Sequence, residues 1–220
     1  MNIFTGLKTL EEKESKFNGK VSVIKSIAWG TYIQVNGLTQ SGGVVNGVWK
    51  STLKNIKRKN LEIKKILILG LGGGSVAILS QKFWKDAKIV GVDIDPVMVD
   101  MGRKHLGLNK LEMEIHIGDA FKYLKANKDK YDLVIIDMYK GDEVPGDLKS
   151  DQFLEIIKAN LDEKGIAVFN RLYFGEKRPE AMRFGEKLQK FFSKVEYFYP
   201  EANLMFISSN SEKQGSNSDY

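Results

Sequence analysis

The chain has 220 residues, of which 42% are hydrophobic and 28% are charged, a composition typical of a soluble globular protein with a sizeable core. It contains no cysteine and only two histidines, which excludes disulfides and a cysteine nucleophile, and we expect no metal site. No apolar run is long enough to span a membrane and no signal-peptide core is present, so we expect a cytoplasmic protein without membrane contact.

The net charge of +6 raises nucleic acid as a possible acidic partner. The lysines are scattered along the whole chain, however, and the densest run, at 54–59, can simply face water at the end of a helix. We therefore expect no nucleic-acid partner.

The first part of the chain, 1–60, is predicted to form a small N-terminal β-hairpin domain and a connecting helix. Residues 1–19 are polar and carry no clear pattern. Segments 21–24 and 31–35 have the β-rich composition of two hairpin strands, and Asn36-Gly37 is a turn signal because both residues tolerate positive φ. A helix is expected over about 44–56, with its apolar side chains on one face.

From residue 66 onward, strand-like apolar runs alternate with helical patterns. The expected strands cover 66–69, 89–92, 113–117, 133–136, 166–170, 195–199 and 204–207, and the expected helices cover 75–84, 97–106, 120–128, 151–161 and 179–192. This alternation predicts an α/β fold with a doubly wound, mostly parallel seven-stranded sheet. The four residues between the last two strands suit a hairpin, so the last strand should run antiparallel. We expect this Rossmann-like domain over 61–208 and a disordered tail over 209–220.

A glycine-rich turn follows the first of these strands. Gly70, Gly72 and Gly74 precede a helix, so strand, turn and helix should bring bare backbone N–H groups and a helix N-terminus to one point. Asp93 ends the next strand, where folds of this kind place a carboxylate for ribose hydroxyls. The alternative is structural: the glycines make a tight turn and Asp93 caps the following helix, although Asp95 can do that unaided.

Carboxylates also end the third and fourth strands. Ligand sites in open α/β sheets form at the carboxyl ends of the strands, so Asp93, Asp119 and Asp137 should face one site. They could accept hydrogen bonds from a ribose and an adenine amino group, and Asp137 could favour a cationic sulfonium or ammonium. The sequence has no second Gly-rich or basic feature that could bind a pyrophosphate, which argues against NAD and FAD. It also lacks the Walker pattern, which argues against nucleoside triphosphate hydrolysis.

The motifs that carry these residues resemble the spermidine synthase family, which has the class I S-adenosylmethionine methyltransferase fold. They are Ile-Leu-Ile-Leu-Gly-Leu-Gly-Gly-Gly-Ser, Val-Asp-Ile-Asp-Pro, Gly-Asp-Ala and Tyr-Asp-Leu-Val-Ile-Ile-Asp, in the family's order and spacing. The resemblance runs from about residue 14 to residue 208. It implies a transferase that uses an adenosyl sulfonium compound.

The resemblance also implies roles for single residues. The implied cofactor contacts are Gly70, Gly72 and Gly74 around the amino-acid or aminopropyl end, Asp93 at the ribose with Ile94 beside it, Asp119 and Ala120 at the adenine, and Gln40 from the N-terminal domain. Asp137 would contact the cofactor and act as the catalytic residue that accepts a proton from the attacking amine. Tyr139 and Asp142 would contact the amine substrate, although both could equally belong to an ordinary surface loop.

Three departures from the family pattern bear on the reaction. Gly73 stands where aminopropyltransferases have an aspartate that binds the aminopropyl amine, Lys140 stands where they have an aspartate for the polyamine, and Asn46-Gly-Val-Trp49 replaces a Tyr and Glu pair. This pattern looks like the divergent branch called spermidine synthase-like. An amino-acid carboxylate near Gly73 would prefer bare amides, which favours S-adenosylmethionine itself.

The first hypothesis is therefore aminopropyl transfer from decarboxylated S-adenosylmethionine to a polyamine, with methylthioadenosine as the second product. The alternatives are methyl transfer from S-adenosylmethionine to a protein or small-molecule amine, with S-adenosylhomocysteine as the product, and a catalytically inactive nucleoside-binding relative. Family analogy predicts a homo-oligomer, such as a dimer, formed through the β hairpins.

Overall fold

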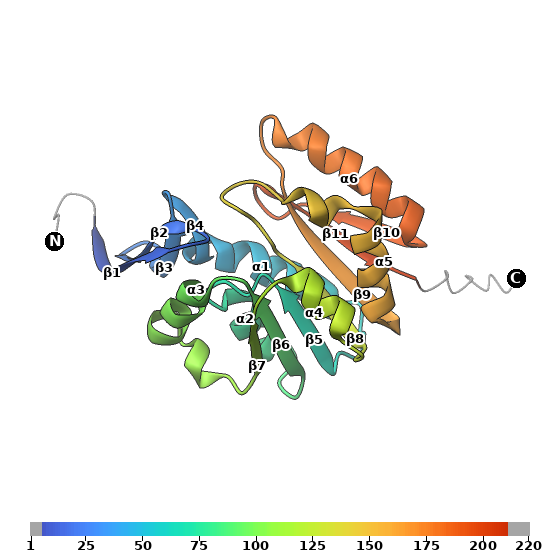
Figure 1. Cartoon of the computed structure of the whole chain (residues 1–220), viewed down its shortest axis with the longest axis horizontal. Coiled ribbons are helices and arrows are strands. Elements are labelled where there is room, and N and C mark those ends of the chain that lie inside the picture. Colours follow the sequence, from blue (N-terminus) through green and yellow to red (C-terminus); the bar gives the residue numbers. More distant parts are fainter. Residues whose placement is uncertain (1–5, 211–220) are drawn as a thin grey trace, which may run out of the picture.

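The computed structural model describes residues 6–210, which form a four-stranded antiparallel sheet followed by a seven-stranded sheet with helices on both faces (Figure 1). The first sheet contains β1 (Leu7–Ser15), β2 (Gly19–Ser26), β3 (Gly30–Val35) and β4 (Leu38–Gly42). The second contains β5 (Lys65–Leu69), β6 (Lys88–Asp93), β7 (Glu114–Ile117), β8 (Tyr131–Ile136), β9 (Leu161–Leu172), β10 (Lys194–Phe198) and β11 (Asn203–Ser209). The helices are α1 (Gly43–Lys57), α2 (Ser75–Phe83), α3 (Pro96–Met101), η1 (Gly102–Leu106), η2 (Leu108–Lys110), α4 (Ala120–Ala126), η3 (Gly146–Lys149), α5 (Asp151–Asn160) and α6 (Lys177–Phe191).

The seven-stranded sheet confirms the predicted fold class. Its strand order is β10-β11-β9-β8-β5-β6-β7, and β11 is antiparallel to both of its neighbours, as the short 200–203 connection predicted. Of the predicted disordered tail, Ser209 ends β11, Asn210 is described, and 211–220 lie outside the described residues.

The N-terminal sheet contains two strands that the sequence did not reveal. Residues 7–15 pair with β2 as an edge strand, and most of their side chains are exposed, so no apolar alternation marks the strand. The predicted turn lies at Asn36 and Gly37, with φ of 48° and 80°, and the chain after it returns as β4 before α1 begins. β4 therefore carries Gln40 and Ser41 toward the large sheet.

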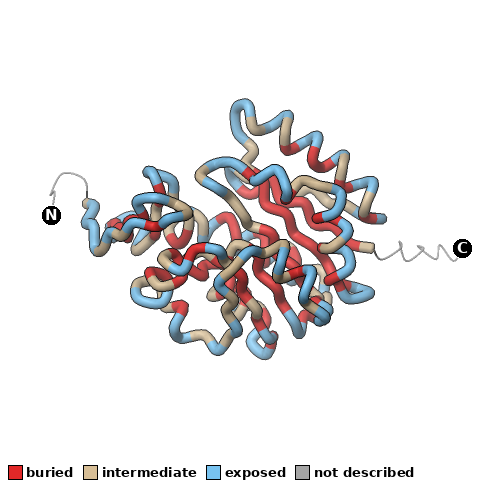
Figure 2. The backbone as a smooth tube through the Cα atoms, viewed as in Figure 1, coloured by how far each residue is buried: buried red, intermediate tan, exposed pale blue. Residues whose placement is uncertain are grey.

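The core lies on both faces of the central strands, which are buried in Figure 2. Along β5, Ile66 and Ile68 pack toward α1 and α2, whereas Leu67 and Leu69 pack toward α4, α5 and α6. All four side chains are fully buried, which explains why the strand reads as a continuous apolar run. No helix within residues 6–210 is long and apolar enough to cross a membrane.

The N-terminal sheet is joined to the segment after β6 by apolar and polar contacts. Val21 and Ile33 belong to a small buried cluster that includes Met98 of α3. The fully buried Asp95 carboxylate accepts a hydrogen bond from the Ser15 hydroxyl at 2.5 Å and another from Asn18 Nδ2 at 2.6 Å. These contacts hold the N-terminal sheet against the segment that follows the carboxyl end of β6.

Candidate active site

A cavity of about 1150 Å³ lies between β4, α1 and the carboxyl ends of β5, β6 and β8. Single-ligand pockets typically measure about 300–1,000 Å³, so this cavity has room for two reactants. The predicted site residues that line it are Gln40, Gly70, Gly72, Asp93, Ile94, Asp119, Ala120, Asp137, Tyr139 and Asp142. Segments far apart in the sequence thus meet at one site, as the strand-end rule predicted.

The glycine-rich turn lies against the end of β8. Gly70 has φ of 87°, and a Cβ there would come within 2.1 Å of the Asp137 carbonyl oxygen, so only glycine fits this position. Gly72 lies beside β4 and lines the cavity. Gly74 does not line it, because Leu108 covers the position where a Cβ would stand, at 2.5 Å from Leu108 Cδ1. The structure therefore places Gly74 in the packing behind the turn, away from its predicted place around the cofactor.

The backbone N–H groups of the turn are already hydrogen-bonded within the protein. Gly70 and Leu71 donate to the Val92 carbonyl, Gly72 donates to Asp93 Oδ2, Gly73 donates to Ser41 Oγ, and Gly74 donates to the Leu71 carbonyl. The expectation of bare amides at this turn is therefore wrong for residues 70–74. The reason is tertiary: β4 and β6 bring oxygen acceptors to the turn.

Gly73 faces the N-terminal sheet and does not line the cavity. A Cβ at this position would lie 2.6 Å from Ile33 Cδ1 and 3.0 Å from Ser41 Cβ. The space that a side chain at position 73 would need is therefore filled by β3 and β4. A reactant carboxylate cannot use the Gly73 N–H unless the bond to Ser41 breaks.

Asp93 ends β6 at the cavity wall. Its Oδ2 accepts the Gly72 N–H at 2.6 Å and its Oδ1 accepts the Asp95 N–H at 2.9 Å. Burial raises the pKa of Asp93, and the two backbone N–H groups oppose that rise. Asp95 caps α3 through the Val97 N–H, so helix capping does not explain Asp93.

Asp119 and Gln40 stand at other parts of the wall. The Asp119 Oδ1 caps α4 by accepting the Lys122 N–H at 2.8 Å, and Ala120 follows it as the first residue of that helix. Gln40 reaches the cavity from β4. The positions of these residues agree with the predicted nucleoside half of the site, whose roles remain predictions.

Asp137 follows β8 and is held by two side-chain donors. Trp49 Nε1 donates to Oδ2 at 2.9 Å, and Asn170 Nδ2 donates to Oδ1 at 2.8 Å. Asn203 in turn donates to Asn170 Oδ1 at 2.9 Å. Burial raises the pKa of Asp137, while the bonds from Asn170 and Trp49 and the positive charge of Arg171 oppose the rise. This is the environment of a carboxylate that can take up a proton.

The sequence interpretation did not recognise Trp49 and Asn170 as site residues. Trp49 was noted only as an apolar residue of the predicted helix and as the end of the stretch that replaces the family's Tyr and Glu pair, whereas in the structure its indole N–H donates to Asp137, 88 residues away in the chain. The sequence does carry a signal for Asn170, because this polar residue directly follows the apolar run 166–169 near the carboxyl end of β9.

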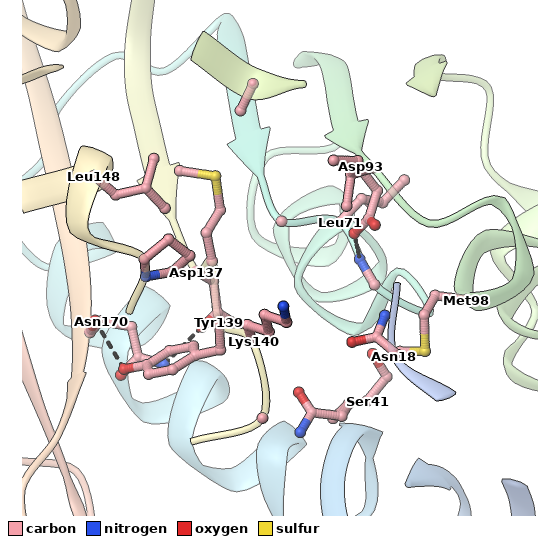
Figure 3. Close-up of a pocket in the computed structure, with 18 of the residues that line it drawn as sticks. Asn18, Ser41, Leu71, Asp93, Met98, Asp137, Tyr139, Lys140, Leu148 and Asn170 are labelled. Atoms are coloured by element: carbon pink, nitrogen blue, oxygen red, sulfur yellow. Dashed lines mark hydrogen bonds between the residues drawn. The ribbon is translucent and has the colours of Figure 1, made fainter. Parts of the chain in front are cut away.

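Tyr139 and Asp142 line the cavity but already have partners. The Tyr139 hydroxyl donates to the Asn170 carbonyl at 3.0 Å, and Asp142 forms an ion pair with Lys177 at 3.0 Å. Figure 3 shows Asp137, Tyr139 and Asn170 on one side of the cavity and Asp93, Met98 and Ser41 on the other. The Lys140 side chain extends between these two groups (Figure 3).

The sequence matches the spermine/spermidine synthase domain over residues 49–216. The chain belongs to this family. It is 31% identical to a polyamine aminopropyltransferase of Vibrio vulnificus over 58% of this chain and 46% of that protein, and 33% identical to one of Chromobacterium violaceum over 60% of this chain and 51% of that protein. These matches span about half the length of the two curated relatives. A polyamine aminopropyltransferase of Clostridioides difficile is 28% identical over 90% of this chain and 75% of its own.

Solved structures agree on the fold. A spermidine synthase in complex with the transition state analogue AdoDATO has a TM-score of 0.78 at 18% identity, covering 93% of this chain and 74% of that chain. Spermidine synthase from Thermotoga maritima gives 0.77 at 17% identity over 93% of this chain and 73% of that chain. Human methyltransferase-like protein 13 in complex with SAH has a TM-score of 0.61 at 19% identity, covering 79% of this chain and 83% of that chain. At these identities the likeness shows the fold alone.

Proposed function

We propose that this chain is a transferase that alkylates an amine with an adenosyl sulfonium donor, and that the transferred group is an aminopropyl group, as in the family's named relatives. The observation that carries the proposal is Asp137, a carboxylate held by Trp49 and Asn170 in the wall of a cavity that also exposes Asp93. Family membership and the similarity to polyamine aminopropyltransferases support the same reaction.

The cavity wall fits such a donor. The Asp93 carboxylate ends β6 beside the glycine turn, where it can accept hydrogen bonds from ribose hydroxyls in addition to its two backbone partners. Asp119 has one oxygen that does not serve the α4 cap, so it can accept a bond from an amino group of the base. Gln40 and Ala120 would border the nucleoside.

The donor supplies an activated carbon next to a positively charged sulfur, and the rest of the chemistry falls to the protein's side chains. The amine lone pair forms the new C–N bond as the C–S bond breaks, and the electron pair of the C–S bond stays on sulfur as a neutral thioether. Asp137 orients the amine and takes the proton that its nitrogen loses. The cavity holds both reactants close together, which contributes much of the rate.

The test is transfer from decarboxylated S-adenosylmethionine to 1,4-diaminobutane, followed by the appearance of methylthioadenosine and the alkylated amine. Asp137→Asn should lower turnover by roughly 10²–10⁴-fold, the usual contribution of a positioned general base, while donor binding measured by calorimetry is retained. Asp162→Asn is the control, because Asp162 is an exposed carboxylate outside the cavity wall. Turnover by Asp137→Asn at the wild-type rate would contradict the proposal.

Methyl transfer from S-adenosylmethionine is the second candidate, and one observation favours it. Position 73 offers no carboxylate for the amine of an aminopropyl donor, and Ile33 and Ser41 fill the space that such a side chain would occupy. The mass of the alkylated product separates the two reactions, since an aminopropyl group and a methyl group add different masses.

We propose further that the chain self-associates through its N-terminal sheet. Ile27 and Trp29, in the turn between β2 and β3, are 90% and 59% exposed, which is unusual for large apolar side chains. Light scattering after size exclusion should show a dimer or larger species for the wild type and a smaller species for Ile27→Lys. A wild-type monomer at micromolar concentration would refute this proposal.

A further inference from the structure

Lys140 brings a positive charge into the middle of the cavity. It lies three residues after Asp137, its side chain is exposed to the cavity, and Figure 3 shows it reaching between the Asp137 side and the Ser41 side. Among residues 6–210, no carboxylate oxygen lies within 4.0 Å of the Lys140 ammonium. The backbone there is held by paired bonds, since the Lys140 N–H donates to the Glu143 carbonyl at 2.8 Å and the Glu143 N–H donates back at 3.3 Å.

The acidic side chains nearest to Lys140 in the chain already have partners. Asp137 accepts hydrogen bonds from Trp49 and Asn170, as described above. The carboxylates of Asp142 and Glu143 both lie close to Lys177, at 3.0 Å and 3.5 Å. Lys177 of α6 thus neutralises Asp142 and Glu143, and the Lys140 ammonium has no ion-pair partner among residues 6–210.

The other lysines of the cavity wall differ from Lys140. The ammonium groups of Lys16 and Lys125 lie over the rings of Phe17 and Phe121, at 4.7 Å and 4.4 Å from the ring centroids. Lys122 lies in the first turn of α4, which follows β7. In the sheet, β5 and β6 lie between β7 and β8, so Lys122 enters the wall away from the end of β8. Among the lysines of the cavity wall, Lys140 is therefore the one that follows β8, the strand that leads to Asp137.

An ammonium without a carboxylate partner in this place can attract a carboxylate of a reactant. The turn at 70–74 cannot take the carboxylate in its place, because its N–H groups already donate to protein oxygens. We propose that Lys140 binds a carboxylate carried by one of the two reactants and thereby sets the substrate class of the enzyme. The carboxylate belongs either to S-adenosylmethionine as the donor or to an amino-acid-type amine as the acceptor. This inference rests on the proposed alkylation of an amine.

The two sources require the same bond changes at the reacting atoms. With a carboxylated acceptor, the amine nitrogen forms its bond to the aminopropyl carbon, the C–S bond breaks, and Asp137 takes the proton. With S-adenosylmethionine, the same nitrogen attacks a carbon next to sulfur that belongs to the methyl or the aminocarboxypropyl group. Thioether, alkylated amine and one proton are the products in each case.

Two pairs of reactants that differ by a single carboxylate test the inference. S-adenosylmethionine is compared with its decarboxylated form as the donor, and ornithine is compared with 1,4-diaminobutane as the acceptor. All four combinations are assayed with the wild type, Lys140→Met, Lys140→Asp and the control Lys122→Met. A hydrogen bond between Lys140 and a carboxylate should favour the carboxylated member of a pair by on the order of tenfold to a hundredfold in kcat/KM.

The wild type should prefer the carboxylated member of one pair at least about tenfold, Lys140→Met should abolish that preference, and Lys140→Asp should reverse it. Lys122→Met should leave it unchanged. The pair that shows the preference identifies the source of the carboxylate. A wild-type preference for decarboxylated donor with 1,4-diaminobutane, or a preference that survives in Lys140→Met, would overturn the inference.

Binding separates a failure of this inference from a failure of the proposed function. If no combination is turned over, the proposed reaction is wrong, and calorimetry is then run with both donors and, in the presence of methylthioadenosine, with both acceptors. Tighter binding of a carboxylated compound that Lys140→Met loses would still support carboxylate recognition. Equal binding within both pairs would overturn it.

Discussion

Replacing Trp49 by phenylalanine should move the acid limb of the transfer reaction toward higher pH. The Trp49 indole N–H donates to Asp137 Oδ2 at 2.9 Å and stabilises the ionised carboxylate. A hydrogen bond to a charged group is worth about 1.5–3 kcal/mol. Losing this bond removes stabilisation of the ionised form and should therefore raise the pKa of Asp137 further.

The assay is the pH dependence of kcat/KM, whose acid limb reports the ionisation of the free enzyme's base. Asp137 must be ionised to accept a proton, so a higher pKa removes activity on the acid side and leaves the rate at high pH largely intact. Carbon NMR of the Asp137 carboxyl, assigned with Asp137→Asn, measures the same pKa without any substrate.

Trp84→Phe is the matched control for this experiment. Trp84 is also a buried tryptophan, but its indole N–H has no hydrogen-bond partner among the described residues. The substitution removes the same atoms and should leave the pKa of Asp137 unchanged. An acid limb that does not move in Trp49→Phe, or that moves equally in both variants, would refute the assigned role of Trp49.

Three further changes test other parts of the site. Arg171→Met should also shift the acid limb of kcat/KM upward, because the Arg171 charge lowers the pKa of Asp137, and an unchanged limb would contradict that coupling. Ser15→Ala should lower the free energy of urea unfolding by about 1–3 kcal/mol, since it removes a donor to the buried Asp95 carboxylate, whereas the exposed Ser51→Ala should have little effect. Gly73→Asp should lower the melting temperature rather than create an amine site, because its Cβ would lie 2.6 Å from Ile33 Cδ1, while Gly146→Ala meets nothing within 4 Å and should be tolerated. A Gly73→Asp variant with wild-type stability and tighter binding of the decarboxylated donor would show that the N-terminal sheet yields at this point.

Much of the large sheet could be predicted because burial on both faces leaves a direct trace in the sequence. Residues 66–69 of β5 and 133–136 of β8 are continuous apolar runs, and a short run of this kind between turns and helical patterns indicates a strand that is covered on both faces. The carboxyl ends of parallel strands must meet at one edge, so Asp93 and Asp137 could be assigned to one site without coordinates.

The edge strands left no such trace. Residues 7–15 expose most of their side chains, and β4 is short and polar, so neither shows a two-residue alternation. Their conformation is imposed by backbone pairing with β2 and β3, which only the folded chain provides.

The sequence by itself determined which strand ends bring carboxylates to the cavity, whereas the tertiary structure decided which other residues join them and which groups are free to bind a ligand. The glycines predicted a turn with open amides, but Ser41 and Asp93 arrive from β4 and β6 and accept two of those N–H groups. Trp49 and Asn170 meet Asp137 only because α1, β8 and β9 pack together. Whether a backbone N–H or a carboxylate already has a hydrogen-bond partner depends on distances of about 3 Å between residues far apart in the chain. Such distances are set by tertiary packing rather than by the local sequence pattern.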